Sequence, residues 1–118
     1  MELTTAVKKD VVVVSIVGNV LQEDVNHLRQ TLDELLKTNR FNIVLDLSAT
    51  QYVSSMGLAA IVSARKQFRN FKGDVRLAGA NELVYRLLET TRLLQTFSVH
   101  HYIEDAVESY HDDTNMEV

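Results

Sequence analysis

Two adjacent serines, Ser54 and Ser55, are the side chains of this sequence best placed to do chemistry. They follow a β-branched apolar run that ends in Asp46-Leu47 and a short polar turn, and they precede a helical pattern. A hydroxyl at a helix N-terminus faces unpaired backbone N–H groups and the positive end of the helix dipole. It can cap the helix, line an anion site or carry a phosphate. Capping is the simplest interpretation, and the sequence leaves the other two open.

A rigid framework is needed to present these hydroxyls, and the hydrophobic pattern predicts one. β-branched and alternating runs predict strands at residues 3–8, 11–17, 19–21, 42–47, 75–78 and 97–100. Helical spacing of apolar residues predicts helices from 23 to 39 or 40, over 56–71, from 81 through 88 and beyond, and over 103–110. The strand–helix–strand order favours parallel pairing. The predicted fold class is α/β, with a mixed, mostly parallel sheet of four to five strands and about four helices packed on it.

Length and charge predict a single domain followed by an acidic tail. The chain has 118 residues, of which 46% are hydrophobic, enough for one core. Six acidic residues and no Lys or Arg follow from Glu104 onward, although the net charge is only −4. We therefore expect a domain over residues 1–110 and a disordered acidic C-terminal tail over 111–118.

Composition also narrows the function. Without cysteine there is neither a disulfide nor a thiolate metal site, and we expect no metal and no cofactor. No apolar stretch approaches the ~20 residues of a membrane span, and the first residues do not resemble a secretory signal, so we expect a cytoplasmic protein without membrane insertion. No basic surface interleaved with aromatic residues is apparent, and we expect no nucleic-acid partner.

The second predicted helix has two distinct faces. Residues 57, 60, 61, 64, 68 and 71 form a core-facing arc, and a second arc carries Ser55, Leu58, Val62, Arg65, Lys66 and Arg69. Aliphatic side chains partly exposed beside cations are typical of a protein-binding surface, although such residues can also be ordinary solvated positions. Glycine destabilises the interior of a helix, so Gly57 calls for an explanation. Close packing of the helix and room for a partner loop are the two candidates, and the sequence leaves both open.

The same stretch resembles the signature of STAS domains, in particular the bacterial anti-sigma-factor antagonists. Asp46-Leu47-Ser48 opens that motif, Tyr52-Val53 is its aromatic–aliphatic pair and Gly57-Leu58 closes it. Ser55 falls on the phosphorylated serine. The resemblance continues through residues 75–79 and 84–94 and covers nearly the whole chain. Two departures are the replacement of acidic residues by Ser54, just before the phosphoacceptor, and by Leu21, in the short early strand.

The resemblance implies a STAS-like fold and a regulatory function. Members dock in unphosphorylated form on an anti-sigma factor that is also a serine kinase, which releases the sigma factor. Phosphorylation ends the docking, and a serine phosphatase resets the switch. The resemblance therefore implies that Ser55 is the phosphoacceptor, with Ser54 as the second candidate. The expected partner-binding residues are Ser54, Ser55, Met56, Gly57, Leu58, Val62, Lys66 and Arg69.

Three other functions compete with this one. An enzyme would need a base for the serine, but the chain lacks Gly-x-Ser-x-Gly, and adjacent His100 and His101 would point to opposite faces of a strand. We therefore expect no enzymatic activity. A STAS module can instead be a regulatory subunit of a transporter or stress-signalling complex. Nucleotide binding is disfavoured because no glycine-rich phosphate loop is present.

Overall fold

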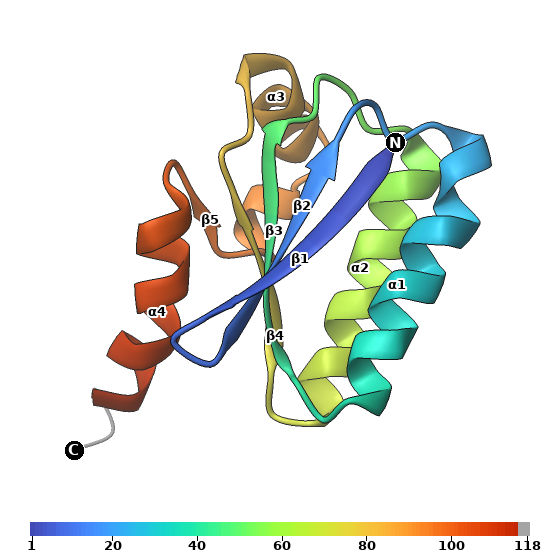
Figure 1. Ribbon diagram of the computed structural model, residues 1–118. Helices are drawn as coiled ribbons and strands as arrows, with labels where there is room; N and C mark the ends of the chain where they lie inside the picture. The colour runs from blue at the N-terminus through green and yellow to red at the C-terminus, as the bar shows by residue number, and fades with distance from the viewer. Residues whose placement is uncertain (116–118) are drawn as a thin grey trace.

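The computed structural model describes residues 1–111 in full and the backbone of residues 112–115. Within these residues, two consecutive strands are followed by alternating helices and strands, giving five strands and four α-helices (Figure 1). Two short 3-10 turns, Gln22–Asp24 and Leu93–Gln95, precede α1 and follow α3. The elements are β1 (Glu2–Lys8), β2 (Val11–Val17), α1 (Val25–Lys37), β3 (Asn42–Ala49), α2 (Ser55–Asn70), β4 (Asp74–Ala78), α3 (Glu82–Thr90), β5 (Val99–His100) and α4 (Ile103–Asn115).

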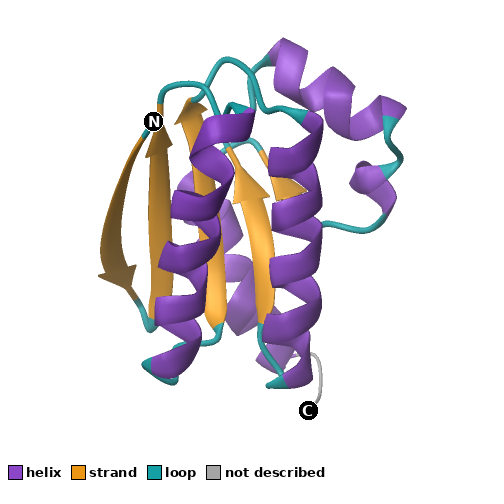
Figure 2. Ribbon diagram, turned by 90° about the vertical axis from the view of Figure 1, so that its right-hand side faces the viewer, coloured by secondary structure: helices purple, strands orange, loops and turns teal. Residues whose placement is uncertain are grey.

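The strands form one five-stranded sheet in the order β1-β2-β3-β4-β5. β1 pairs antiparallel with β2, and the remaining neighbours pair in parallel. Helices α1 and α2 cover one face of the sheet, α4 lies on the other, and α3 lies near the end where the parallel strands finish (Figures 1 and 2). This confirms the predicted α/β class and the mixed, mostly parallel sheet.

Burial on both faces explains the β-branched run of β2. Val12 and Val14 belong to the main core beneath α1 and α2, whereas Val11 and Val13 join a smaller cluster beneath α4. Successive strand residues point to opposite faces, so a central strand covered on both sides reads as a continuous apolar run. The position of β2 inside the sheet follows from this.

Several element boundaries differ from the sequence prediction. The expected strand at 19–21 is a single bridge between Val20 and Val53, and β5 is only two residues long. Phe71, assigned to the core arc of the second helix, lies past its end and is 56% exposed. Its ring stacks on Phe41 at a centroid distance of 4.9 Å. The helical wheel was wrong there because α2 stops at Asn70.

The last helix is longer than expected. α4 continues to Asn115, so residues 111–115 of the predicted tail are helical, and the rest of that tail, 116–118, lies outside the described residues. Within the described part of the chain, no helix combines the length and apolar character that crossing a bilayer requires.

Candidate functional site

The two serines have separate roles at the start of α2. Ser54 is the N-cap in extended conformation, and its Oγ accepts a hydrogen bond from the Gly57 N–H at 3.1 Å. Its own N–H donates to the Val20 carbonyl at 2.8 Å, and the Val20 N–H donates to the Tyr52 carbonyl at 2.9 Å. These bonds surround the bridge between Val20 and Val53, which holds the turn before α2 against the segment after β2. Half-buried Ser54 is thus a structural cap.

Ser55 is the first helical residue, and its side chain is exposed. The amides of the first helical turn start without an intrahelical partner. Ser54 supplies acceptors for the N–H groups of Gly57 and Leu58, so those of Ser55 and Met56 have no acceptor among the described residues. Added negative charge on the Ser55 hydroxyl would therefore lie beside open donors and the positive end of the helix dipole.

Gly57 lets the helix approach the bridge closely. A Cβ atom at this position would lie 2.8 Å from Cγ1 of Val20 and 2.9 Å from Cγ1 of Val53, and both valines are buried. Of the two reasons that the sequence left open for this glycine, close packing is therefore the one present in the fold.

Exposed apolar side chains accompany the hydroxyl. Leu21 and Tyr52 flank the Val20–Val53 bridge and are each 40% exposed, and Met56, in the first turn of α2, is 49% exposed. We call Leu21, Tyr52, Ser55 and Met56 the helix-tip surface. A small polar centre beside large exposed apolar groups is a common composition for a protein-binding surface.

The predicted partner face along α2 is only partly a surface. Leu58 is 8% exposed and belongs to the main core, so its assignment to partner binding was wrong. Val62 is half-buried and packs against the same core. The segment that links α3 to β5 runs beside α2 and covers this side of the helix (Figure 2). The Arg65 guanidinium lies 5.4 Å from the centre of the Phe97 ring in that segment.

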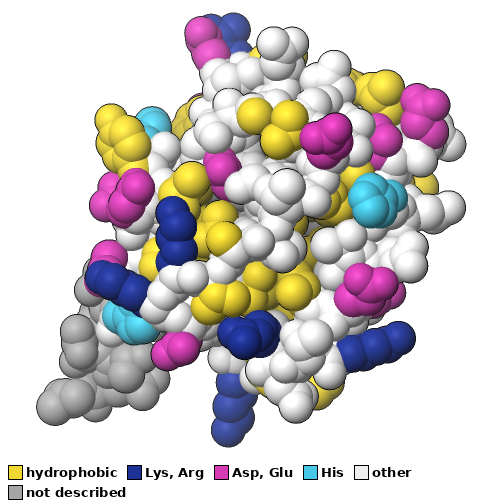
Figure 3. Space-filling model, in the orientation of Figure 1, with side chains coloured by type: hydrophobic (Ala, Val, Ile, Leu, Met, Phe, Trp, Pro, Cys, Tyr) yellow, Lys and Arg dark blue, Asp and Glu magenta, His cyan; other side chains and the backbone are white. Residues whose placement is uncertain are grey.

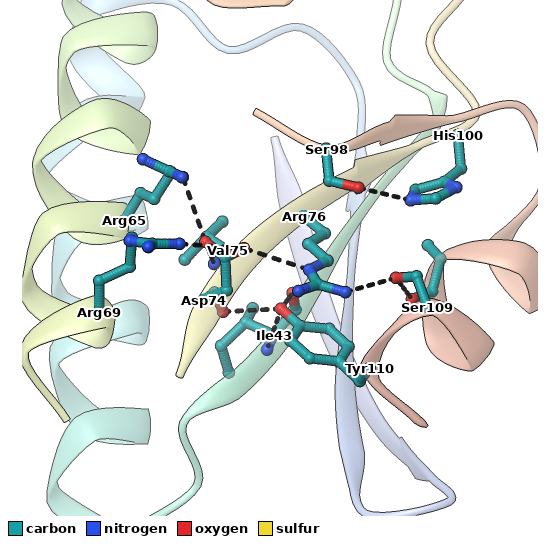
Figure 4. A network of polar contacts seen from close by, with 11 residues as sticks. Ile43, Arg65, Arg69, Asp74, Val75, Arg76, Ser98, His100, Ser109 and Tyr110 are labelled. Carbon is teal, nitrogen blue, oxygen red and sulfur yellow. Dashed lines mark hydrogen bonds and ion pairs between the residues drawn. The ribbon is translucent and has the colours of Figure 1, made fainter. Parts of the chain in front are cut away.

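The basic residues of the same face differ in accessibility. Lys66 is exposed, and Arg69 is 54% exposed although its Nη1 lies 3.8 Å from Oδ2 of Asp74. Arg65 is largely buried, with its Nε 3.1 Å from Oδ1 of Asp74. The Asp74 side chain is buried, and its Oδ2 also lies 3.1 Å from Nε of Arg76 in β4 (Figure 4). The Asp74 carboxylate is therefore ion-paired with three arginines, two from α2 and one from β4.

This cluster extends to α4 on the opposite face of the sheet. Arg76 donates from Nη1 to Oγ of Ser109 at 2.7 Å, and its guanidinium lies 4.0 Å from the centre of the Tyr110 ring. The Tyr110 hydroxyl accepts from the Ile43 N–H at 3.1 Å and lies within donating distance of the Asp74 carbonyl, at 2.8 Å. We call Arg65, Arg69, Asp74 and Arg76 the Asp74 cluster. It ties α2, β4 and α4 together and has a structural role.

The sequence analysis did not predict a serine–histidine pair at β5, in which Ser98 directly precedes the strand and His100 ends it. Ser98 Oγ lies 2.7 Å from Nε2 of His100, two residues along an extended segment and therefore on the same face. Burial and, to a smaller degree, Arg76 lower the pKa of His100, with Asp105 opposing them. The adjoining cavity of about 50 Å³, lined by Ala80, Tyr85, Val99, His100 and His101, is too small for a substrate. The spacing of two residues between Ser98 and His100 was the sequence signal that could have predicted this pair.

No group of three or more His, Cys, Asp or Glu side chains within the described residues is arranged to hold a metal ion. The helix-tip surface is therefore the strongest candidate for function.

Known proteins share the fold described above. The STAS domain family model matches residues 2–108. A Thermotoga maritima protein proposed to be an anti-sigma factor antagonist is 26% identical, with 91% of this chain and 92% of that chain covered and a TM-score of 0.86. The anti-sigma factor antagonist SpoIIAA of Bacillus, solved with and without phosphate, has a TM-score of 0.72 in its phosphorylated form at 13% identity, over 92% of this chain and 99% of that chain. A sulfate transporter family protein from Wolinella succinogenes has a TM-score of 0.74 at 16% identity, over 86% of this chain and 84% of that chain. The last two similarities concern the fold alone.

Proposed function

Because the chain belongs to the STAS domain family, we propose that it is an anti-sigma-factor antagonist switched by phosphorylation. In its unphosphorylated form it docks on an anti-sigma factor with serine kinase activity in the cytoplasm, and the sigma factor is released. The kinase then modifies Ser55, and a serine phosphatase restores the hydroxyl. The protein itself is the substrate of these reactions and not an enzyme. The observation that carries the proposal is the exposed Ser55 hydroxyl at the first residue of a 16-residue helix.

The similar proteins support this choice of partner. The Thermotoga maritima neighbour is proposed to be an anti-sigma factor antagonist, and its similarity extends over nearly the whole of both chains. SpoIIAA is an anti-sigma factor antagonist with the same fold and has been solved in a phosphorylated form, so this fold can hold the modification.

Physical chemistry supports an interface switch. A phosphoserine adds a charge of about −1.5 to −2 at pH 7. At Ser55 that charge lies beside two open backbone amides, so the fold accommodates it. A partner that covers Leu21, Tyr52 and Met56 would instead have to desolvate the phosphate. Docking is therefore lost while the domain keeps its structure.

The interface proposed here is smaller than the face predicted along α2. Its centre is the helix-tip surface, with Ser54 as a cap behind it and Gly57 beneath it. Lys66 and Arg69 lie about 16 Å or more along the helix axis from Ser55, so they can contact the rim of a partner but do not neutralise the phosphate. Leu58 takes no part because it is buried.

Phosphorylation by a candidate anti-sigma factor kinase from the source genome tests the proposal. The purified protein is incubated with the kinase and ATP, and the modified residue is mapped by intact-mass and peptide analysis. One phosphate on Ser55 is expected, with none on Ser55→Ala and continued labelling of Ser54→Ala, the matched control. Labelling that persists in Ser55→Ala and disappears in Ser54→Ala would move the site to the cap. No labelling by any such kinase, together with no binding to one, would refute the proposal.

A regulatory subunit of a transporter is the second candidate, favoured by the similarity to the Wolinella succinogenes protein. Capture from native extract separates the two functions. An ATP-binding serine kinase retained by the wild type and lost with Ser55→Asp supports the antagonist. A transporter subunit retained by both forms supports the alternative.

A further inference from the structure

β1 forms one edge of the sheet, and its outer side is uncovered. In the described part of the chain, β1 pairs only with β2. All of its residues except Leu3 are exposed, and Val7 is 53% exposed. Figure 2 shows β1 at the margin of the sheet with no helix in front of it. A strand of seven residues with a free edge presents unpaired N–H and C=O groups that can pair with another strand.

The hydrogen bonds of β2 show which backbone N–H and C=O groups of β1 point away from the sheet. The N–H of Gly18 donates to Ala49 at the end of β3, and the carbonyl of Ile16 accepts from the Thr50 hydroxyl just beyond it. Even-numbered residues of β2 therefore direct their backbone groups toward β3, and odd-numbered ones toward β1. The register opposes odd-numbered residues of β2 to even-numbered residues of β1. The backbone groups of Leu3, Thr5 and Val7 consequently point away from the sheet.

We propose that two copies of this chain associate through antiparallel pairing of their β1 strands, centred on Thr5. In this register Leu3 of one copy exchanges backbone hydrogen bonds with Val7 of the second, and the two Thr5 residues exchange theirs. Glu2 of each copy lies opposite Lys8 of the other. Neither of these two charged side chains has an ionic partner among residues 1–111, whereas the adjacent Lys9 is already paired with Glu108 of α4.

Charge favours this register over its neighbours, and apolar surface favours association through this side of the molecule. Centring the pair on Leu3 leaves Lys8 without an opposite residue in β1, and centring it on Val7 does the same to Glu2. Only the pairing centred on Thr5 uses the whole strand and forms both ion pairs, and cross-strand pairs of opposite charge stabilise a sheet. Figure 3 views the molecule onto the side of β1, where hydrophobic side chains gather in the middle of the face and charged ones lie around them. A second copy would cover part of this apolar surface.

The pairing would join the two sheets into one. A two-fold axis perpendicular to the sheet keeps α1 and α2 of both copies on the same face. The Glu2 end of β1 lies at the α2 tip, because Glu2 opposes Val17 and nearby Val20 bridges to Val53. Since the strands run in opposite directions, the two Ser55 residues would lie at opposite ends of the dimer. Each helix-tip surface stays open, and this proposal does not depend on the function proposed for Ser55.

Sedimentation equilibrium of the full chain over a wide concentration range tests the dimer through charge. Glu2→Lys places two lysines opposite each other at each end, and Lys8→Glu does the same with two glutamates. Each variant alone should show a dissociation constant weakened by roughly tenfold. A mixture of the two should form heterodimers of nearly wild-type affinity, because every Lys then faces a Glu.

That restoration on mixing is the decisive result, since a folding defect in either variant could not produce it. A wild type that remains monomeric at the highest concentration would overturn the proposal. So would single variants that dimerise as well as the wild type, because the contact would then lie elsewhere.

Proline substitutions test the direction of the backbone groups. Thr5→Pro removes an N–H that points outward, so the monomer should stay folded while the dimer is lost. Thr4→Pro, the matched control, removes an N–H that pairs with β2 and should lower the melting temperature markedly. The reverse pattern, with Thr5→Pro the less stable variant and Thr4→Pro still dimeric, would refute the proposed register.

Discussion

The two ends of α2 differ in how exposed they are and in whether their charges are paired within the fold. At its N-terminus, Ser55 and Met56 are exposed, and of the two serine hydroxyls there, that of Ser54 is the one bonded to a described residue. Toward its C-terminus, Arg65 and Arg69 are tied to a buried carboxylate from the next strand. One helix therefore carries a surface open to a partner at one end and an internal ionic cluster at the other.

This difference indicates where the domain can accept a change of charge. At the tip, solvent and open amides surround a new charge, so the free energy of unfolding should hardly change. In the covered part of the helix, a new or an unpaired charge must be buried, which costs several times more. The four predictions below test this contrast, from the largest expected change in stability to the smallest.

Leu58→Glu should have the largest effect. It places a carboxylate in the main core, one turn from the helix start, and we expect a loss of about 4 kcal/mol or an unfolded chain. Met56→Glu is the matched control in the same turn, and its exposed side chain should leave stability within about 0.5 kcal/mol of the wild type. Urea unfolding followed by circular dichroism measures both. Similar values for the two variants would mean that Leu58 is accessible after all.

Asp74→Ala should come next. It removes the shared acceptor and leaves Arg65 and Arg76 largely buried without their carboxylate, at a cost of about 3 kcal/mol. Asp74→Asn keeps the size and part of the hydrogen bonding, so it should cost less. Urea unfolding of both variants is again the measurement. A loss below about 1 kcal/mol for Asp74→Ala would show that the three arginines are solvated in solution.

Ser54→Ala and Ser55→Ala form a pair that separates the two hydroxyls. Loss of the Ser54 cap leaves the Gly57 N–H without its acceptor and should cost about 1 kcal/mol. Ser55→Ala should change stability by less than about 0.5 kcal/mol, because no described residue bonds to that hydroxyl. Thermal unfolding under matched conditions checks the order. Equal losses would contradict the division of roles between cap and phosphoacceptor.

Ser55→Asp should change stability least and binding most. An acidic group in the first turn of a helix is favourable by about 0.3–1 kcal/mol, so the unfolding midpoint should stay or rise slightly. Affinity for the anti-sigma factor, measured by calorimetry, should fall because the added charge is desolvated on docking. Unchanged affinity would argue against an electrostatic switch, and a large loss of stability would argue against an exposed tip.

Much of the fold was predictable because its signals are local. Continuous β-branched residues marked β2 and β3 as buried strands, and Asn81 marked the start of α3, where its side chain accepts from the Val84 N–H at 2.8 Å. The start of α2 was within one residue of its true position, since a Ser-Ser pair before a helical pattern is a strong capping signal. Phosphorylation of Ser55 itself stays a prediction.

The remaining features depend on partners distant in sequence. The helical wheel placed Leu58 on an exposed arc, but it could not show that the segment between α3 and β5 returns to cover that side of α2. In the sequence, Asp74 directly precedes the strand predicted at 75–78, and its type and position predict no ionic cluster. Its importance arises from three arginines that reach it from two elements.

By itself, the sequence determined the class of fold, the order of the elements and the position of a hydroxyl at a helix start, because periodicity and capping act over a few residues. Only the tertiary structure decided which side of α2 is covered, which arginines are held inside and which edge of the sheet stays open. Burial and ion pairing are set by contacts between segments that meet only after folding, and no local pattern encodes them.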